Sequence, residues 1–266
     1  MIKKCGIMNV SGSRPLLFFS TTYFMYIGNA VDTVVHEHHA IQIVISFDGP
    51  IDIIQSGSIT KLKAAIIDSD QEHECKTFQS PFILLNIDPE SKIGSGLKKT
   101  YLDKQKIAAL PIILSENFLV EIEPFLLNNI DSTSIYKLVQ RFLLSLSHTT
   151  AIAISDDRVT KVLSLLNEPG KDIVKIKELA DAIYISPGRL IHLFTDQVGI
   201  PIRKYVLWRK LLTTLHQLME TKNLTVAALD GGFYDSPHFN RTFKKMFGLS
   251  PSLLLQNSQI IQVYKE

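Results

Sequence analysis

Between Leu16 and Pro89 the chain alternates short apolar runs with turn residues. The runs are rich in β-branched and aromatic side chains, and breakers such as Asp48-Gly49-Pro50 and Ser56-Gly57-Ser58 separate them. Such runs between turn residues predict β-strands. Six or more short strands at this spacing favour an all-β sandwich or barrel, of the jelly-roll kind. We expect the strands at Leu16–Phe19, Thr22–Ile27, Ala40–Phe47, Ile51–Ile54, Ala64–Ile67 and Phe82–Ile87.

After Pro111 the apolar residues recur at intervals of three or four, which is the period of an α-helix. Phe118, Ile122, Phe125 and Leu126 predict one amphipathic helix. A stronger stripe from Ile135 to Leu146 predicts a second, with Ser132 or Ser134 as its N-cap. These two helices either cover the β domain or pair with a second copy of the chain.

From Ser155 to Pro251 the pattern is that of helices separated by short turns. The Thr/Ser/Ala-rich stretch from His148 to Asp157 predicts a linker that ends in a helix start, because Asp156 and Asp157 favour the first helical turn. The length of 266 residues suits two domains or one large one, so it does not decide the number by itself. We expect an effector-sensing or dimerisation domain at residues 1–150 and a DNA-binding domain at residues 151–266.

The helical part contains two similar halves. In the first, a short apolar stripe and a turn lead to Ser186-Pro187, a strong helix start, and Gly199 stops the new helix. The stripe is Ile176, Leu179, Ala180 and Ile183, and the inward face of the new helix is Leu190, Leu193, Phe194 and Val198.

The second half repeats this design around a turn at Gly231-Gly232. Its first helix carries the apolar residues Val226, Ala227, Leu229 and Phe233, and its second helix starts at Asp235-Ser236-Pro237, buries Phe239, Phe243 and Phe247 and ends at Gly248. A long helix from Ile202 to Met219 separates the halves, with Tyr205, Val206, Trp208 and Leu212 toward a core. Two short helices with a tight turn, the second with a polar and basic outer face, predict a helix-turn-helix unit.

The run from Gly232 to Pro251 resembles the signature of the AraC/XylS family of bacterial transcription regulators, G-F-x-D-x-S-x-F-x-R-x-F-K-x-x-x-G-x-S-P. The first half is similar to the family's first unit, through Leu179-Ala180, Ser186-Pro187, Leu190, Phe194 and Gly199. The chain departs from the family at three positions. Pro237 replaces a Ser, Gly231 stands beside Gly232, and Thr214 lies near the place of an Ala.

The resemblance implies that the second helix of each unit reads DNA. By matching position, the first would use Gly188, Arg189, Ile191 and His192, and the second Ser236, His238, Asn240, Arg241, Lys244 and Lys245. Arginine can contact guanine through two hydrogen bonds, and asparagine can contact adenine in the same way. The two lysines are expected at phosphates, which fix position without reading sequence.

The resemblance also implies a cupin-like β-barrel in the N-terminal domain, and hence an α+β multidomain chain. His36, His38, Gln42 and Gly49 resemble the first cupin motif, with Gln in place of Glu, and His73 could be the His of the second motif. His36 and His38 would face one side of a strand, and three imidazoles can hold a divalent metal. Because Gln is a poorer ligand than a carboxylate, and the second motif lacks its proline and glycines, we expect a metal-free effector pocket at His36, His38, Gln42 and His73, and no cofactor.

Composition and charge agree with these expectations without deciding them. Hydrophobic residues make up 45% and charged residues 20%, as in a folded globular protein. Residues 155–251 hold 14 Lys and Arg against 10 Asp and Glu, a mild excess of positive charge that suits a polyanion. Cys5 and Cys75 are too few for a disulfide framework, and the uncharged run from Pro15 to Val31 is too short and too interrupted to span a membrane.

The sequence therefore predicts a cytoplasmic, nucleoid-associated activator that binds specific DNA sites and is not an enzyme. The expected partners are double-stranded promoter DNA, RNA polymerase, a small-molecule effector and a second copy of the chain, with no membrane. Two alternatives from other classes stay open. One is a metal-dependent cupin enzyme with a helical appendage, and the other is a dimerisation or scaffold protein without salt-dependent DNA affinity.

Overall fold

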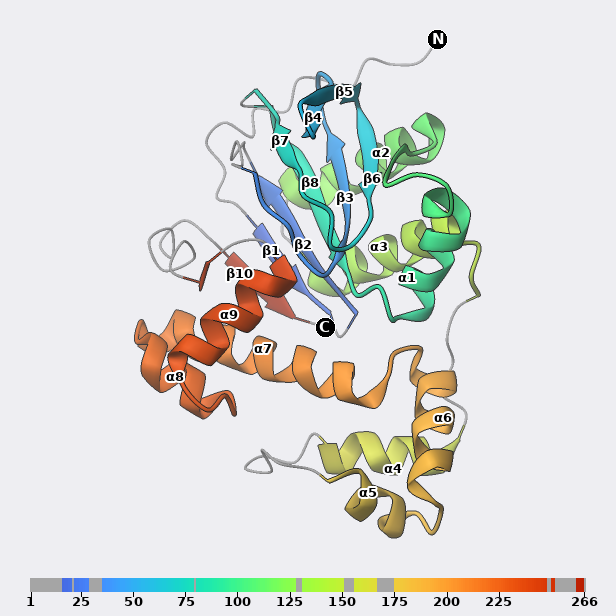
Figure 1. Ribbon diagram of the computed structural model, residues 1–266, viewed down its shortest axis with the longest axis vertical. Coiled ribbons are helices and arrows are strands. Elements are labelled where there is room, and N and C mark those ends of the chain that lie inside the picture. Colours follow the sequence, from blue (N-terminus) through green and yellow to red (C-terminus); the bar gives the residue numbers. More distant parts are fainter. Residues whose placement is uncertain are drawn as a thin grey trace.

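The chain folds into a β-rich N-terminal part and a helical C-terminal part (Figure 1). The computed structural model describes residues 16–20, 22–28, 35–78, 80–127, 131–150, 156–166, 175–247, 250–251 and 262–265. Residues 151–155, which are half of the expected linker and follow the expected domain boundary at residue 150, lie outside the described residues, as do Cys5 and Gly248.

The strands of the N-terminal part form two sheets. The seven-stranded sheet has the order β10-β1-β2-β8-β3-β6-β9, and the three-stranded sheet has the order β5-β4-β7. All six predicted strands are present, within one residue at each end. The strands are β1 (Leu16–Phe19), β2 (Tyr23–Gly28), β3 (Ile41–Ser46), β4 (Ile51–Gln55), β5 (Ser58–Leu62), β6 (Ala64–Ile67), β7 (Glu74–Lys76), β8 (Phe82–Ile87), β9 (Ile107–Ala109) and β10 (Gln262–Lys265).

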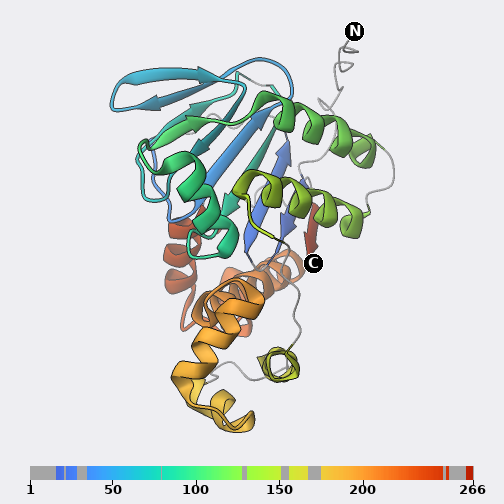
Figure 2. The same ribbon diagram turned by 90° about the vertical axis from the view of Figure 1, so that its right-hand side faces the viewer.

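Both faces of the large sheet are buried, which explains why its strands read as almost continuous apolar runs. Alternate residues such as Ile43 and Leu85 point to one core, and their neighbours Val44 and Leu84 point to the opposite side. Helices cover the first face: α1 (Lys92–Leu97), α2 (Ile112–Leu127) and α3 (Ser132–Ser147), with the short π-helix η2 (Lys98–Leu102) after α1 (Figure 2). The two predicted helices are α2 and α3, so they cover their own domain.

Two details of the N-terminal prediction are wrong. The N-cap of α3 is Asp131, whose side chain accepts a hydrogen bond from the Thr133 amide, and neither serine has that role. The described strands also form two separate sheets and no closed barrel. The physical reason is that α1 to α3 bury one face of the large sheet, while the small sheet and the C-terminal helices bury parts of the other.

The C-terminal part is made of helices in the predicted order. They are α4 (Asp157–Leu166), α5 (Ile176–Ala182), α6 (Pro187–Val198), α7 (Ile202–Thr221), α8 (Leu224–Asp230) and α9 (Ser236–Phe247). The long helix α7 carries the fully buried Trp208 and joins the two helix-turn-helix units. In the part of the chain that is described, no helix is both long and apolar enough to cross a membrane.

The C-terminal helices also pack against the N-terminal sheet. Leu17, Phe19 and Phe24 of β1 and β2 belong to the same core as Trp208. Trp208 Nε1 donates a hydrogen bond of 2.9 Å to Asp88 Oδ2, just beyond the end of β8. Beside it, the Glu90 carboxylate forms an ion pair of 2.6 Å with Arg203 and another of 3.1 Å with Lys204. An apolar core and a charged cluster thus fix α7 to the N-terminal part.

Candidate nucleic-acid interface and histidine cluster

The first helix-turn-helix unit consists of α5 and α6. Ser186 caps α6 by accepting a hydrogen bond of 3.3 Å from the Arg189 amide, and Pro187 takes the first helical position. Tyr184, in the turn, has a φ of 58°, and Gly199, with a φ of 82°, ends α6. The predicted start and end of this recognition helix are confirmed.

The second unit consists of α8 and α9 and has the same plan. Asp235 accepts a hydrogen bond of 2.6 Å from the His238 amide, as Ser186 does from Arg189. Gly232, with a φ of 78°, lies two residues beyond α8, as Tyr184 lies two residues beyond α5. The two units therefore share a left-handed residue in the turn and a side-chain cap, but the cap follows that residue by two positions in the first unit and by three in the second.

The apolar pattern assigned to α8 is only half right. Ala227 and Phe233 are buried, whereas Val226 is 41% and Leu229 53% exposed. The physical reason is that α8 has only seven residues, so only part of its surface meets α7 and α9.

Gly231 allows α8 to approach α7 closely. A Cβ built on Gly231 would overlap the Thr214 hydroxyl and lie 2.8 Å from the Thr214 Cβ. Thr214 is fully buried, and its hydroxyl donates to the carbonyl of Lys210. Two of the departures from the family pattern, Gly231 and Thr214, therefore contact one another.

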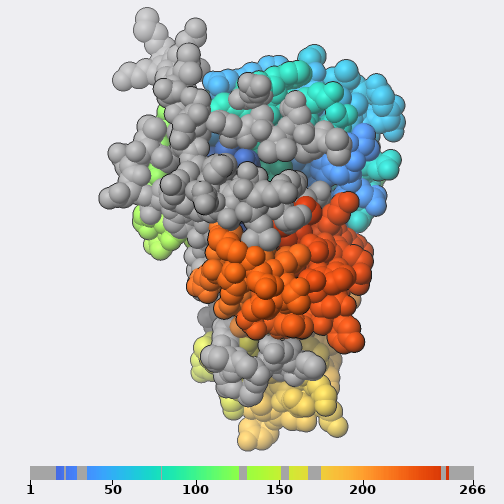
Figure 3. Space-filling view, turned by 90° about the vertical axis from the view of Figure 1, so that its left-hand side faces the viewer, coloured from blue at the N-terminus to red at the C-terminus, as the bar shows by residue number. Residues whose placement is uncertain are grey.

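The structure places the predicted DNA-reading residues on the outer faces of α6 and α9. Leu190, Phe194, Phe239 and Phe243 on the opposite faces are buried. In Figure 3 the red-orange surface of the α9 region lies below the blue surface of the N-terminal part. The exposed residues of the predicted set are Gly188, Arg189, Ile191, His192, His238, Arg241, Lys244 and Lys245, and the half-exposed ones are Ser236 and Asn240.

Counting from each cap, the two helices present different chemistry. The position of Arg189 in α6 corresponds to His238 in α9, and the position of His192 corresponds to Arg241. Both helices thus carry one arginine and one histidine, in opposite order. Only α9 adds lysines in its last turn, Lys244 and Lys245.

The N-terminal part contacts the C-terminal end of both recognition helices. The Lys92 amide donates a hydrogen bond of 2.7 Å to the carbonyl of Gly199, after α6, and the Lys92 ammonium pairs with Asp196. The His39 amide donates a hydrogen bond of 2.7 Å to the carbonyl of Lys245, in α9. These N-terminal segments are therefore hydrogen-bonded to the two helices whose exposed side chains are predicted to read DNA.

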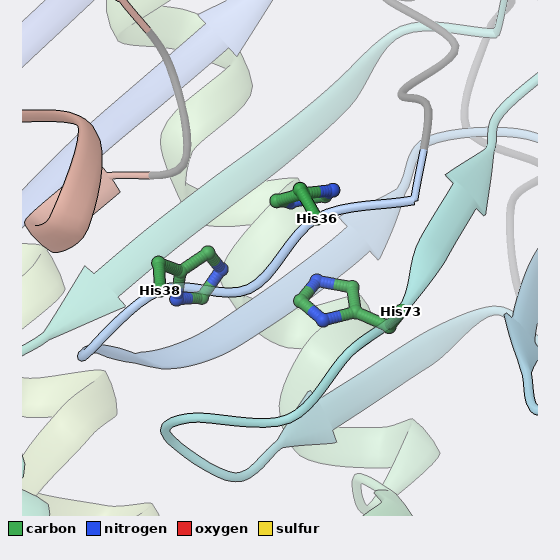
Figure 4. Close-up of side chains that lie close together, drawn as sticks. All are labelled: His36, His38 and His73. Atoms are coloured by element: carbon green, nitrogen blue, oxygen red, sulfur yellow. The ribbon is translucent and has the colours of Figure 1, made fainter.

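His36, His38 and His73 lie together in the N-terminal part, as the sequence predicts (Figure 4). Their ring centroids are 4.4 to 5.6 Å apart. The prediction of one strand for His36 and His38 is wrong, since only His36 is paired, through an isolated bridge to His73. The three rings are therefore brought together by that bridge and by the bend before β3. They are not brought together by the alternation of side chains along one strand.

Gln42 joins the cluster from β3. Its Oε1 lies 2.7 Å from His38 Nε2 and 2.8 Å from His73 Nε2. The other nitrogen of each ring faces a backbone carbonyl, that of Ala40 for His38 and that of Gln71 for His73. Burial lowers the pKa of His38 and lowers the pKa of His73 to about 3, so both rings are neutral at pH 7.

Asn86 is a further polar residue here that the sequence pattern does not reveal. It stands directly opposite Gln42 in the pairing of β3 with β8, so the two side chains share a face of the sheet. It is 1% exposed, and neither atom of its amide has a hydrogen-bond partner among the described residues. A single polar residue in an apolar strand, as in the run Phe82–Ile87, is the signal that could have identified it.

Comparison with known proteins identifies the C-terminal part. A family model described as a helix-turn-helix domain matches residues 179–257. The arabinose operon regulatory protein of Escherichia coli is 32% identical over 102 residues, which are 36% of this chain and 34% of that protein. The Msm operon regulatory protein of Streptococcus mutans is 26% identical over 96 residues, which are 35% of this chain and 34% of that protein. The C-terminal part of this chain is thus similar to the corresponding parts of these operon regulators.

The matched segment spans about a third of the length of these regulators. Among solved structures, ToxT of Vibrio cholerae covers 89% of this chain and 98% of its own, at 11% identity and a TM-score of 0.45. An AraC-type DNA-binding domain protein of Chromobacterium violaceum covers 38% of this chain and 92% of its own, at 24% identity and a TM-score of 0.35. The sequence similarity to these regulators thus lies in the helix-turn-helix segment.

Proposed function

We propose that this protein is a transcription regulator, an activator, that binds specific sites in double-stranded DNA through α6 and α9. The observation that carries the proposal is the pair of capped helices with outward polar and basic side chains, inside a segment that matches a helix-turn-helix domain model. A recognition helix reads base edges in the major groove, where each base pair has its own pattern of donors and acceptors.

The helix α7 gives the two units a spacing that suits one DNA site. Its 20 residues run between the end of α6 and the start of α8. At 1.5 Å per residue they span about 30 Å. Successive major-groove faces on one side of the duplex are about 34 Å apart. Both recognition helices would therefore meet one face of one binding site.

A binding titration tests this proposal. Duplexes that bind the full chain are selected from a random-sequence library, and their affinity is measured in gel-shift titrations at several salt concentrations. We expect one shared sequence motif and a logarithmic affinity that falls linearly with the logarithm of salt, because contacts to phosphates release counterions. Selection of no motif, or affinity that is independent of salt, would contradict the proposal and favour the scaffold alternative.

For the N-terminal part, we propose an effector-sensing domain, related to the cupins, that comprises residues 1–150. Its support is the polar cluster of His36, His38, Gln42 and His73, three of which are buried. RNA polymerase and a second copy of the chain are the proposed protein partners, and the cytoplasm, where the chromosome lies, is the proposed location. The metal-dependent enzyme stays a rival, which the absence of any turnover by a metal-loaded protein would reject.

A further inference from the structure

We propose that His36, His38 and His73 bind a divalent transition-metal ion with Gln42 as an oxygen ligand, and that this ion is the effector that changes DNA affinity. The second half of this proposal rests on the proposed function, whereas the first half stands on the geometry alone. It replaces the metal-free pocket that the sequence favours.

The first support is the convergence of the three rings. One nitrogen of each lies within 4.8 Å of the others. In a tetrahedral zinc site with Zn–N distances of 2.0–2.1 Å, ligand nitrogens are about 3.4 Å apart, so ring movements of roughly 1 Å would complete the site. His36 and His38 lie on one segment before β3, and His73 lies before β7 (Figure 4). Rotation of the rings and small shifts of these segments supply such a movement.

The second support is the protonation that the hydrogen bonds impose. Nδ1 of His38 is 3.0 Å from the Ala40 carbonyl, and Nδ1 of His73 is 2.9 Å from the Gln71 carbonyl. A carbonyl only accepts, so each Nδ1 carries the proton, and each neutral ring has its lone pair on Nε2. Metal-binding histidines typically donate their other N–H to a carbonyl or carboxylate in this way.

Both Nε2 lone pairs face Gln42 Oε1, which is itself only an acceptor. Two arrangements of neutral rings resolve this conflict. Without an ion, the Gln42 amide turns over and its NH2 group donates one hydrogen bond to each ring. With a cation, the two lone pairs and Oε1 all point to it. The cluster therefore has a satisfied empty state and a satisfied metal-bound state.

The ligand set indicates which metals suit the site. Three imidazoles and an amide oxygen carry no charge and favour zinc, nickel, cobalt, copper or ferrous iron over calcium or magnesium, which prefer several oxygen ligands.

Asn86 supplies a third, independent support. Its buried amide lacks a partner among the described residues and stands across the strand pair from Gln42. It can hydrogen-bond a water molecule on the ion.

A short path connects the cluster to α9. The carbonyl of His38 accepts a hydrogen bond of 2.8 Å from the Asp70 amide, and the next residue, His39, donates its amide hydrogen to Lys245. The His39 ring also pairs with Asp70 at 2.9 Å. A shift of His38 toward an ion thus moves the peptide group between His38 and His39, whose N–H is hydrogen-bonded to α9. An ion alters DNA affinity only if it favours one arrangement of this path over another.

Metal binding is tested first, without DNA. Chelator-treated full-length protein is dialysed separately against Zn²⁺, Ni²⁺ and Co²⁺, and bound metal is measured by elemental analysis. We expect one ion per chain, at least tenfold weaker binding in His36→Ala and His73→Gln, and tighter binding in Gln42→Glu, which adds a carboxylate ligand. The matched control is His216→Ala, because His216 is exposed on α7 beside Glu220 and should leave binding unchanged.

The outcomes separate the two halves of the proposal. No stoichiometric binding of any of the three ions, or equal binding by the wild type and both folded histidine variants, overturns the metal site. If His73→Gln does not melt cooperatively, the half-buried His36→Ala decides alone. A gel-shift titration on the selected duplex, with and without the bound ion, tests the effector role, and we expect at least a fivefold change that His36→Ala abolishes. Metal binding with unchanged DNA affinity overturns that role, whereas no DNA binding in either state overturns the proposed function instead.

Discussion

Gly231 and Thr214 show how two unusual residues depend on one another. Gly231 has a φ of −81°, which any residue can adopt, so its importance lies in the space next to Thr214. Any side chain at this position has to displace the backbone of α8 from α7. The sequence shows two departures from the family pattern, and only the packing of the helices shows that they form one contact.

We predict that Gly231→Ala destabilises the C-terminal domain by about 1–3 kcal/mol, the usual cost of an overpacked core. Thr214→Ala in the same chain should recover part of this loss, because it removes the overlapping hydroxyl but leaves Cβ only 2.8 Å away. Urea unfolding of the single and double variants measures the coupling. Equal stability of Gly231→Ala and the wild type would show that the helices can separate at no cost.

Arg241 is the exposed residue of α9 with the sharpest expected role. It occupies the position that His192 occupies in α6, and it lies in the segment that matches the helix-turn-helix domain model. We predict that Arg241→Ala weakens binding to the selected duplex about tenfold, within the range of 1–3 kcal/mol for a two-hydrogen-bond contact to guanine. Arg141→Ala, an exposed arginine of α3 paired with Glu121, is the control. Unchanged affinity in a gel-shift titration, with an unchanged unfolding curve, removes Arg241 from the interface.

The helix α9 is held by its aromatic stripe. Phe239 and Phe243 have ring centroids 5.6 Å apart, and both are buried against α7 and α8. We predict that Phe243→Ala costs about 3–5 kcal/mol, as expected for the removal of a buried aromatic ring. Val226→Ala in α8 should cost less than about 1 kcal/mol, because Val226 is 41% exposed. Chemical unfolding of both variants measures the difference, and a similar loss in both would contradict the observed orientation of α8.

The predictability of an element depends on how local its signals are. The start of α6 follows from Ser186 and Pro187, and its end follows from Gly199, since capping involves neighbouring residues only. The strand β5 (Ser58–Leu62) is largely exposed and polar, and β7 has three residues, so neither has an apolar run to mark it. Their place is set by pairing with β4, which no local pattern encodes.

The histidine cluster illustrates the same limit within a site. The spacing of His36 and His38 predicts that they lie together, and a motif brings in Gln42 and His73. Asn86 and the hydrogen bond from His39 to Lys245 depend on which strands and helices meet in the folded chain. Sequence reasoning therefore predicts the chemical identity of the cluster, while its connection to α9 requires the tertiary structure.

The contact between the two parts of the molecule contains ionisable groups that make it sensitive to acid. Burial raises the pKa of Glu90, but hydrogen bonds from Arg203 and Lys204 outweigh it, so the pKa lies below the usual 4.5. A carboxyl whose pKa is lower in the folded state stabilises that state fully above 4.5, and this contribution is lost as the pH falls through the lower, folded value. Trp208, the single tryptophan of the chain, lies at the same contact and donates a hydrogen bond to Asp88.

We predict that acidification from about pH 6 to about pH 3 loosens this contact, because protonation of Glu90 removes its two ion pairs. Trp208 fluorescence should report the change, since water then reaches the buried indole. Glu90→Gln lacks the titrating group and should show weaker binding of the two parts already at neutral pH and a flatter response to acid. Identical fluorescence titrations of the wild type and Glu90→Gln would mean that other groups control the contact. A flatter curve for the variant assigns the acid response to the pairing of Glu90 with α7, the helix that joins both helix-turn-helix units.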